Sequence, residues 1–166
     1  MGQNRQLRAI DGFAFGAYEA MPKDNPRGAI VVIQEIFGVN SHIRNVTDGY
    51  AAAGYAALAP QIFDRVERNV ELGYEQQDMT RGIEIARGKL KMEQTLQDLQ
   101  ATVEDAKRFG KVGVVGYCFD FDPKGKTYVF NILRVSATVV LAAMGAFLFF
   151  LLFTGNKHRR GRSGKS

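Results

Sequence analysis

The sequence contains few residues of the kinds that build disulfide and metal sites. It has one cysteine and two histidines among 166 residues. A lone cysteine excludes an internal disulfide framework and suits a reducing compartment. Cys118 and the distant His42 and His158 do not form a Cys/His metal centre, so neither a metal nor a cofactor is expected. The first residues, MGQNRQLRAIDG, contain no apolar run, and no secretory signal peptide is expected.

Excess basic charge is also absent from most of the chain. Residues 1–119 are nearly charge-balanced, and the formal net charge of +5 arises from the residues that follow. A nucleic-acid-binding domain carries a basic face together with its fold. We therefore expect no nucleic-acid partner.

One long apolar run is present near the C-terminus. Residues 135–153 (VSATVVLAAMGAFLFFLLF) contain no charged side chain, and basic residues follow. At ~1.5 Å per residue such a helix just spans a hydrocarbon core of ~30 Å. We therefore expect a domain over residues 1–119, a linker over 120–130, a transmembrane helix over 131–154 and a basic tail over 155–166. The expected partner of this helix is membrane lipid, or a second copy paired through small residues.

Two rules disagree about the orientation of this predicted span. The basic residues after it favour a cytoplasmic tail. That arrangement would export the N-terminal domain without a signal peptide, whereas a tail anchor inserted after synthesis would leave it in the cytoplasm. We expect the second arrangement, a single-pass membrane protein with a cytoplasmic N-terminal domain.

Short apolar runs alternate with helical patterns in the first 119 residues. Strands are predicted over Phe13–Ala20 (an edge strand), Gly28–Gln34, Tyr55–Ala59 and Lys111–Gly116. Helices are predicted over His42–Ala53, with Ser41 as the cap, and along apolar residues at helical spacing between Ile85 and Ala106. This alternation predicts an α/β fold with a mostly parallel sheet.

Candidate catalytic residues follow two of the predicted strands. Cys118 lies in Gly116-Tyr117-Cys118-Phe119, directly after an apolar strand, which is typical of a nucleophile elbow. A thiol nucleophile needs a proton acceptor and donors that stabilise an oxyanion. Glu35 follows the strand Gly28–Gln34, and active sites of such sheets lie beyond the carboxyl ends of the strands.

Three segments resemble the dienelactone hydrolase family, α/β-hydrolases that open lactones and related esters. They are Gln34–Asn40 (QEIFGVN), Ala59–Phe63 (APQIF) and Lys111–Phe119 (KVGVVGYCF). The resemblance covers about residues 10–119 and implies an incomplete α/β-hydrolase sheet that ends with the nucleophile strand.

The resemblance also implies roles for individual residues. Cys118 would be the nucleophile, and Glu35 the carboxylate that hydrogen-bonds to it and helps to activate it. The backbone N–H groups of Ile36 and Phe119 would stabilise the oxyanion, and Arg81 would bind a substrate carboxylate.

The sequence departs from the family pattern after Phe119. The family continues Gly-Gly, where this chain has Asp120-Phe121. In the family, later strands supply the Asp and His of the triad, whereas the only histidine downstream of Cys118 is His158. His42 on the first predicted helix is interpreted as structural. We therefore expect a hydrolase fragment with a Cys nucleophile that is inactive alone and acts on a small ester or lactone if completed.

Two further interpretations stay open. In the first, the chain is a membrane-tethered binding or interaction module. In the second, it is a truncated or chimeric gene product. In each case the strand at Val112–Val115 would form an uncovered apolar edge of the sheet, through which the chain could self-associate.

Overall fold

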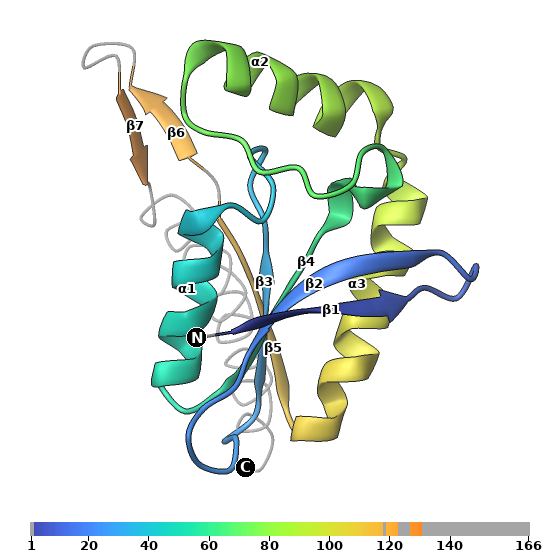
Figure 1. Cartoon of the computed structure of the whole chain (residues 1–166), viewed down its shortest axis with the longest axis vertical. Coiled ribbons are helices and arrows are strands. Elements are labelled where there is room, and N and C mark those ends of the chain that lie inside the picture. Colours follow the sequence, from blue (N-terminus) through green and yellow to red (C-terminus); the bar gives the residue numbers. More distant parts are fainter. Residues whose placement is uncertain (1, 118, 123–126, 131–166) are drawn as a thin grey trace, which may run out of the picture. The chain divides into compact units, whose positions relative to one another are not determined.

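The computed structural model describes residues 2–117, 119–122 and 127–130 (Figure 1). The chain divides into two compact units, and the boundary follows Tyr117. The first unit holds the main sheet and its helices. The second contains β6 (Phe119–Asp122) and β7 (Thr127–Phe130), which pair antiparallel.

The main sheet has five strands in the order β1-β2-β4-β3-β5. They span Gln3–Arg8 (β1), Ala14–Ala20 (β2), Ala29–Ile33 (β3), Ala56–Pro60 (β4) and Val112–Gly116 (β5). β3 pairs in parallel with both β4 and β5, whereas β2 pairs antiparallel with β1 and β4. The sheet is therefore mixed rather than mostly parallel, because the antiparallel hairpin of β1 and β2 is added beside β4.

The first strand of that hairpin was not predicted. β1 has the polar sequence QNRQLR, and Leu7 is its one buried residue. Because β1 lies outside β2, the strand predicted at the edge over Phe13–Ala20 is paired on both sides.

Helices cover both faces of the sheet. α1 (Ser41–Ala52) lies on one face and α3 (Met92–Ala106) on the other, while α2 (Gln76–Ile83) lies beyond the carboxyl ends of β3 and β4 (Figure 1). Short helical turns complete the unit: η1 (Ile62–Arg65), the π-helical η2 (Glu84–Lys89) and η3 (Lys107–Phe109). The side chain that caps α1 is Asn40 rather than Ser41, because its oxygen accepts a hydrogen bond from Ile43 N–H at 3.3 Å.

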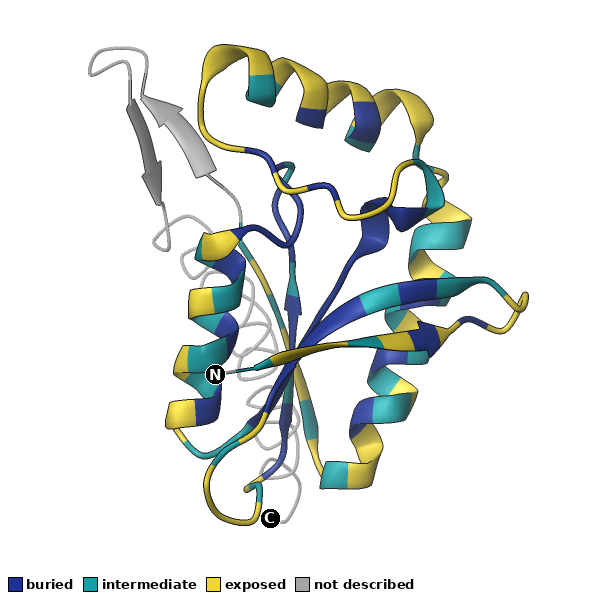
Figure 2. Cartoon of the chain, in the orientation of Figure 1, coloured by how far each residue is buried: buried dark blue, intermediate teal, exposed yellow. Residues whose placement is uncertain are grey.

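The core lies on both faces of the central strands. Val32 packs with Ile43 and Ala51 of α1, whereas its neighbour Val31 packs with Ala106 of α3. Successive strand side chains point to opposite faces, so a doubly covered strand is apolar throughout. Figure 2 shows this burial along β3 and β4, and α2 as mostly exposed.

An ion pair involves a buried carboxylate of α3. The predicted helix between Ile85 and Ala106 is interrupted at the extended residue Leu90, and α3 buries Asp98 and Thr102 while Leu96 is exposed. Arg65 donates to the two carboxylate oxygens of Asp98 at 2.9 and 2.6 Å. A buried charge needs such a partner. The pair therefore accounts for the burial of Asp98, which the apolar pattern does not predict, whereas Val103 and Ala106 of that pattern pack in the core as expected.

The remaining predictions concern residues 120–166. Strands β6 and β7 overlap the range expected as a linker, residues 120–130. The predicted transmembrane helix over 131–154 and tail over 155–166 lie outside the described residues and stay predictions. In the described part of the chain, no helix is long and apolar enough to cross a membrane.

Candidate active site

A tight loop, Glu35–Gly38, follows the carboxyl end of β3. Gly38 N–H donates to the backbone oxygen of Glu35 at 3.3 Å and closes the loop. Gly38 has a φ of +79°, and a Cβ there would lie 1.9 Å from the oxygen of Val70. Both the left-handed conformation and this close approach require glycine.

The segment after η1 holds this loop in place. Leu72 N–H donates to the oxygen of Phe37 at 2.9 Å, and Asn40 Nδ2 donates to the oxygen of Leu72 at 3.0 Å. The ring of Phe37 meets that of Tyr74 edge-on, with centroids 4.7 Å apart. The loop is thus fixed by backbone hydrogen bonds and by an aromatic contact.

Glu35 is a buried carboxylate in an apolar setting. The residue is 5% exposed, and neither carboxylate oxygen has a hydrogen-bond partner among the described residues. Burial raises the pKa of Glu35 to about 7, because desolvation penalises the charged form. A carboxyl group that titrates near neutral pH is suited to accept and return a proton.

Tyr74 adds a polar group beside this carboxyl. Burial raises the pKa of its phenol, a hydrogen bond with the Asn40 side chain opposes that rise, and the Glu35 charge adds to it. Neither Tyr74 nor Asn40 was predicted from the sequence as a site residue.

The backbone of Ile36 supplies a hydrogen-bond donor at this loop. Ile36 is half-buried, and its N–H donates to no group among the described residues. Its oxygen lies against α2, where a Cβ on Gly82 would be 2.1 Å away. Glycine is a poor helix former, but the missing side chain of Gly82 allows α2 to approach the loop.

Arg81 precedes that glycine. Its guanidinium forms an ion pair with Glu67, and its side chain is 52% exposed. The cation predicted to bind substrate thus lies on the helix that contacts the loop. The local sequence around Arg81 did not predict its contact with Glu67.

The other predicted residues lie elsewhere. Cys118 is outside the described residues, and Phe119 begins β6 in the second unit. His42, on α1, has its ring edge-on to Tyr117, with centroids 6.2 Å apart. Burial and a hydrogen bond with Tyr50 raise the pKa of Tyr117 to about 12. In the described part of the chain, no three His, Cys, Asp or Glu side chains group as metal ligands do.

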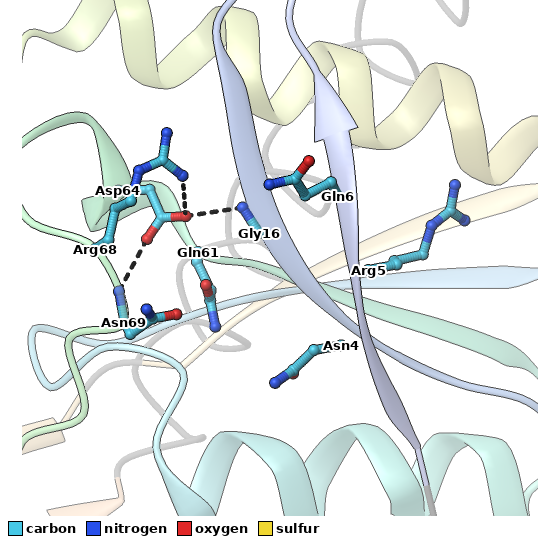
Figure 3. A pocket seen from close by; sticks show the side chains of 8 residues that line it. All are labelled: Asn4, Arg5, Gln6, Gly16, Gln61, Asp64, Arg68 and Asn69. Atoms are coloured by element: carbon cyan, nitrogen blue, oxygen red, sulfur yellow. Dashed lines mark hydrogen bonds and ion pairs between the residues drawn. The ribbon is translucent and has the colours of Figure 1, made fainter.

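A polar cavity of about 390 Å³ lies among β1, β2, the turn after β4 and the segment that follows η1 (Figure 3). The buried Asp64 accepts hydrogen bonds from the N–H groups of Gly16 and Asn69, at 2.8 and 3.2 Å. None of the predicted catalytic residues lines it.

Comparison with known proteins identifies the family. The sequence model of the dienelactone hydrolase family matches residues 15–126. The chain belongs to the dienelactone hydrolase family. Among curated relatives, carboxymethylenebutenolidase of Pseudomonas putida is 33% identical over 116 residues, which are 68% of this chain and 49% of that protein. A Synechocystis protein provisionally named carboxymethylenebutenolidase is 44% identical over 99 residues, which are 54% of this chain and 38% of that protein.

Solved structures agree with this assignment. A Klebsiella pneumoniae crystal structure provisionally described as a dienelactone hydrolase has a TM-score of 0.55 and 29% identity, covering 71% of this chain and 50% of that one. A dienelactone hydrolase-like promiscuous phosphotriesterase from metagenomic libraries has a TM-score of 0.51 at 20% identity. The match covers 70% of this chain and 49% of that one, and it supports the fold alone. The chain spans about half the length, or less, of these relatives and solved structures.

Proposed function

We propose that this chain carries the acyl-accepting part of a dienelactone-hydrolase-type ester or lactone hydrolase. Cys118 is the nucleophile, Glu35 accepts its proton, and the N–H groups of Ile36 and Phe119 stabilise the oxyanion. The observation that carries the proposal is the environment of Glu35. Its carboxyl group is buried at the end of a central strand and has no hydrogen-bond partner among the described residues.

The register of the sheet supports the pairing of Glu35 with Cys118. Ile33 and Gly116 are partners in the parallel ladder of β3 and β5. Glu35 follows Ile33 by two positions in the sequence, and Cys118 follows Gly116 by two. The two proposed acid–base partners thus lie the same number of residues beyond two residues that are paired in the ladder.

The proposed first step is acyl transfer to sulfur. The Cys118 thiol gives its proton to the Glu35 carboxylate, and the thiolate attacks the ester carbonyl. The S–C bond forms, the ester C–O bond breaks, and the leaving alkoxide takes up a proton from water. A base with a pKa of about 7 is partly ionised at neutral pH, which suits this transfer. Hydrolysis of the resulting thioester needs a second base that activates water.

Arg81 is proposed to recognise substrates that carry a second carboxylate. Its present partner is Glu67, and both side chains are about half exposed. An exposed ion pair contributes only about 0–1 kcal/mol. A substrate carboxylate can therefore displace Glu67 at small cost and form a bidentate pair with the guanidinium.

The test uses the single cysteine of the chain. The full chain is mixed with p-nitrophenyl acetate, phenolate release is followed, and the acylated residue is located by mass spectrometry. We expect a stoichiometric burst, a thioester on Cys118 and little turnover. Cys118→Ser should abolish the thioester and Glu35→Gln should slow its formation, whereas Glu93→Gln, an exposed carboxylate on α3, should leave it unchanged.

Two results would contradict parts of this proposal. If Cys118 were acylated no faster than free cysteine, neither Cys118 nor Glu35 would have a catalytic role. This result would favour the alternative, a binding module without catalysis. Sustained turnover that Cys118→Ser abolishes would confirm the nucleophile and overturn the expectation of a burst alone.

A further inference from the structure

The side chain of Gln34 connects the end of β3 to the turn after β4. It is 6% exposed. Its Oε1 accepts a hydrogen bond from Ile62 N–H at 3.2 Å, and its Nε2 donates to the backbone oxygen of Glu35 at 3.3 Å. A backbone N–H can only donate and a backbone oxygen can only accept, so these two partners dictate which way the amide faces.

The oxygen that Gln34 binds belongs to the peptide group that joins Glu35 to Ile36. Gly38 N–H donates to the same oxygen at 3.3 Å, so two donors hold it. No peptide bond in the described part of the chain is cis. In a planar trans peptide the C=O and N–H point in opposite directions. Fixing the Glu35 oxygen therefore also fixes the direction of the Ile36 N–H.

That N–H is the one the proposed mechanism assigns to the oxyanion. It has no acceptor among the described residues, as a donor reserved for a ligand requires. If the peptide turned over, the Glu35 oxygen would replace the N–H and would repel an oxyanion. The following peptide is held separately, because the Ile36 oxygen lies against Gly82.

We infer that Gln34 is a positioning residue that locks the Glu35–Ile36 peptide with its N–H presented to the reacting carbonyl. The role assigned to this N–H rests on the proposed function, whereas the orientation of the peptide does not. Gln34 touches neither substrate nor nucleophile in this account. It acts through one peptide group and obtains its own orientation from Ile62 in the turn after β4.

Two substitutions separate this role from simple packing. Gln34→Glu keeps an oxygen for Ile62 N–H, but it places a second oxygen against the Glu35 carbonyl. Gln34→Met retains the length and bulk and removes both hydrogen bonds. Gln61→Glu is the matched control, since Gln61 is also buried and its side chain makes no hydrogen bond in the described part of the chain.

The first readout is structural and needs no activity. The three-bond HN–Hα coupling and the N–H dipolar coupling of Ile36 are measured by NMR in the full-length chain. A peptide flip changes ψ of Glu35 and φ of Ile36 together. We expect both couplings to change in Gln34→Glu and to stay as in the parent chain in Gln61→Glu.

The second readout is the rate of thioester formation with p-nitrophenyl acetate. Losing one oxyanion donor costs about 10²- to 10³-fold in kcat in other enzymes. We expect a fall of up to this size in the maximal rate for Gln34→Glu, with little change in half-saturating ester concentration. Gln34→Met, which keeps the Gly38 hydrogen bond, should lose less.

The outcomes distinguish this inference from the proposed function. If the Ile36 couplings change in Gln34→Glu while the parent chain forms no thioester, the lock is confirmed and the proposed function is wrong. If the parent chain is acylated and both rate and couplings are unchanged in Gln34→Glu, the inference is overturned and the function stands. If Gln34→Glu does not fold, Gln34→Met decides by the same measurements.

Discussion

Gly82 of α2 lies against the backbone oxygen of Ile36, so closely that a Cβ at position 82 would be 2.1 Å from that oxygen. Glycine inside a helix costs about 0.5–1 kcal/mol relative to alanine. At this position the cost is offset by a close contact between the helix and the loop that carries Glu35. The position of α2 and the shape of the loop therefore depend on one missing methyl group.

Substituting this glycine is expected to destabilise the fold although alanine is the better helix former. Gly82→Ala should lower the free energy of unfolding by about 1–3 kcal/mol, because the methyl group overlaps a backbone atom. Gly88→Ala is the control, since a Cβ there meets nothing within 4 Å, and it should be neutral or stabilising. Urea unfolding of both variants provides the comparison, and equal effects would contradict the contact.

Ionisation of Glu35 is expected to make stability fall as the pH rises. The pKa of this carboxyl is raised from 4.5 to about 7 by burial. Between these values the unfolded chain loses the proton and the folded chain keeps it, so the free energy of unfolding decreases by on the order of 3 kcal/mol. Below pH 4.5 the carboxyl is protonated in both states, and above about pH 7 the cost is constant.

The difference between the parent chain and Glu35→Gln isolates this effect from all other titrations. Glutamine does not ionise, so the variant should gain stability over the parent chain as the pH rises through this interval. Urea unfolding at pH 4.5, 6 and 8 measures the difference. A difference that does not vary with pH would mean that Glu35 has an ordinary pKa in the folded chain.

The ion pair of Arg65 with Asp98 is expected to dominate the packing of α3. Asp98 is fully buried and the Arg65 side chain is 6% exposed. Removing one member of a buried pair costs about 3–5 kcal/mol when the other charge is left unpaired. Arg65 also forms an ion pair with Asp11 at 2.6 Å, so its charge keeps one partner and the loss should fall below this range. Asp98→Asn should still lower the thermal midpoint. Glu104→Gln breaks an exposed pair with Lys107 and should change stability by less than about 1 kcal/mol.

The β5 edge is expected to promote association between chains. β5 lies at one end of the described sheet, and Val114 on it is 56% exposed. An exposed apolar edge strand pairs readily with another chain. In sedimentation velocity, Val114→Lys should reduce the associated fraction. Ile10→Lys changes a more exposed apolar residue in the β1–β2 turn and should have no such effect.

Local sequence patterns were sufficient to predict a strand or helix that is stabilised by its own apolar residues. The runs around β3, β4 and β5 predicted those strands because each is a short, largely apolar segment. β1 was missed because an edge strand with one buried residue, Leu7, has no apolar alternation to detect. Ser41 and Asn40 are both good capping residues, and only the backbone geometry distinguishes them.

Long-range contacts set the limits of prediction at the candidate site. The positions of Glu35 and Ile36 followed from the end of a strand and from family resemblance. The hydrogen bond from Ile62 to Gln34 and the contact of Gly82 with Ile36 join distant segments and leave no periodic signal. The burial of Asp98 was missed for the same reason, because its partner Arg65 comes from a distant segment, whereas Ala106 of the predicted apolar pattern is buried as expected.

The parallel pairing of β3 with β5 has a consequence for biosynthesis. Ala29 pairs with Val112 and Ile33 with Gly116, so most of the domain is translated between the two strands. The β1–β2 hairpin is local and can form early, while β3 has one edge unpaired until β5 leaves the ribosome. Pairings of such high sequence separation form slowly. The nascent chain therefore keeps one edge of β3 open to chaperones, or to other nascent chains, while residues 34–111 are translated.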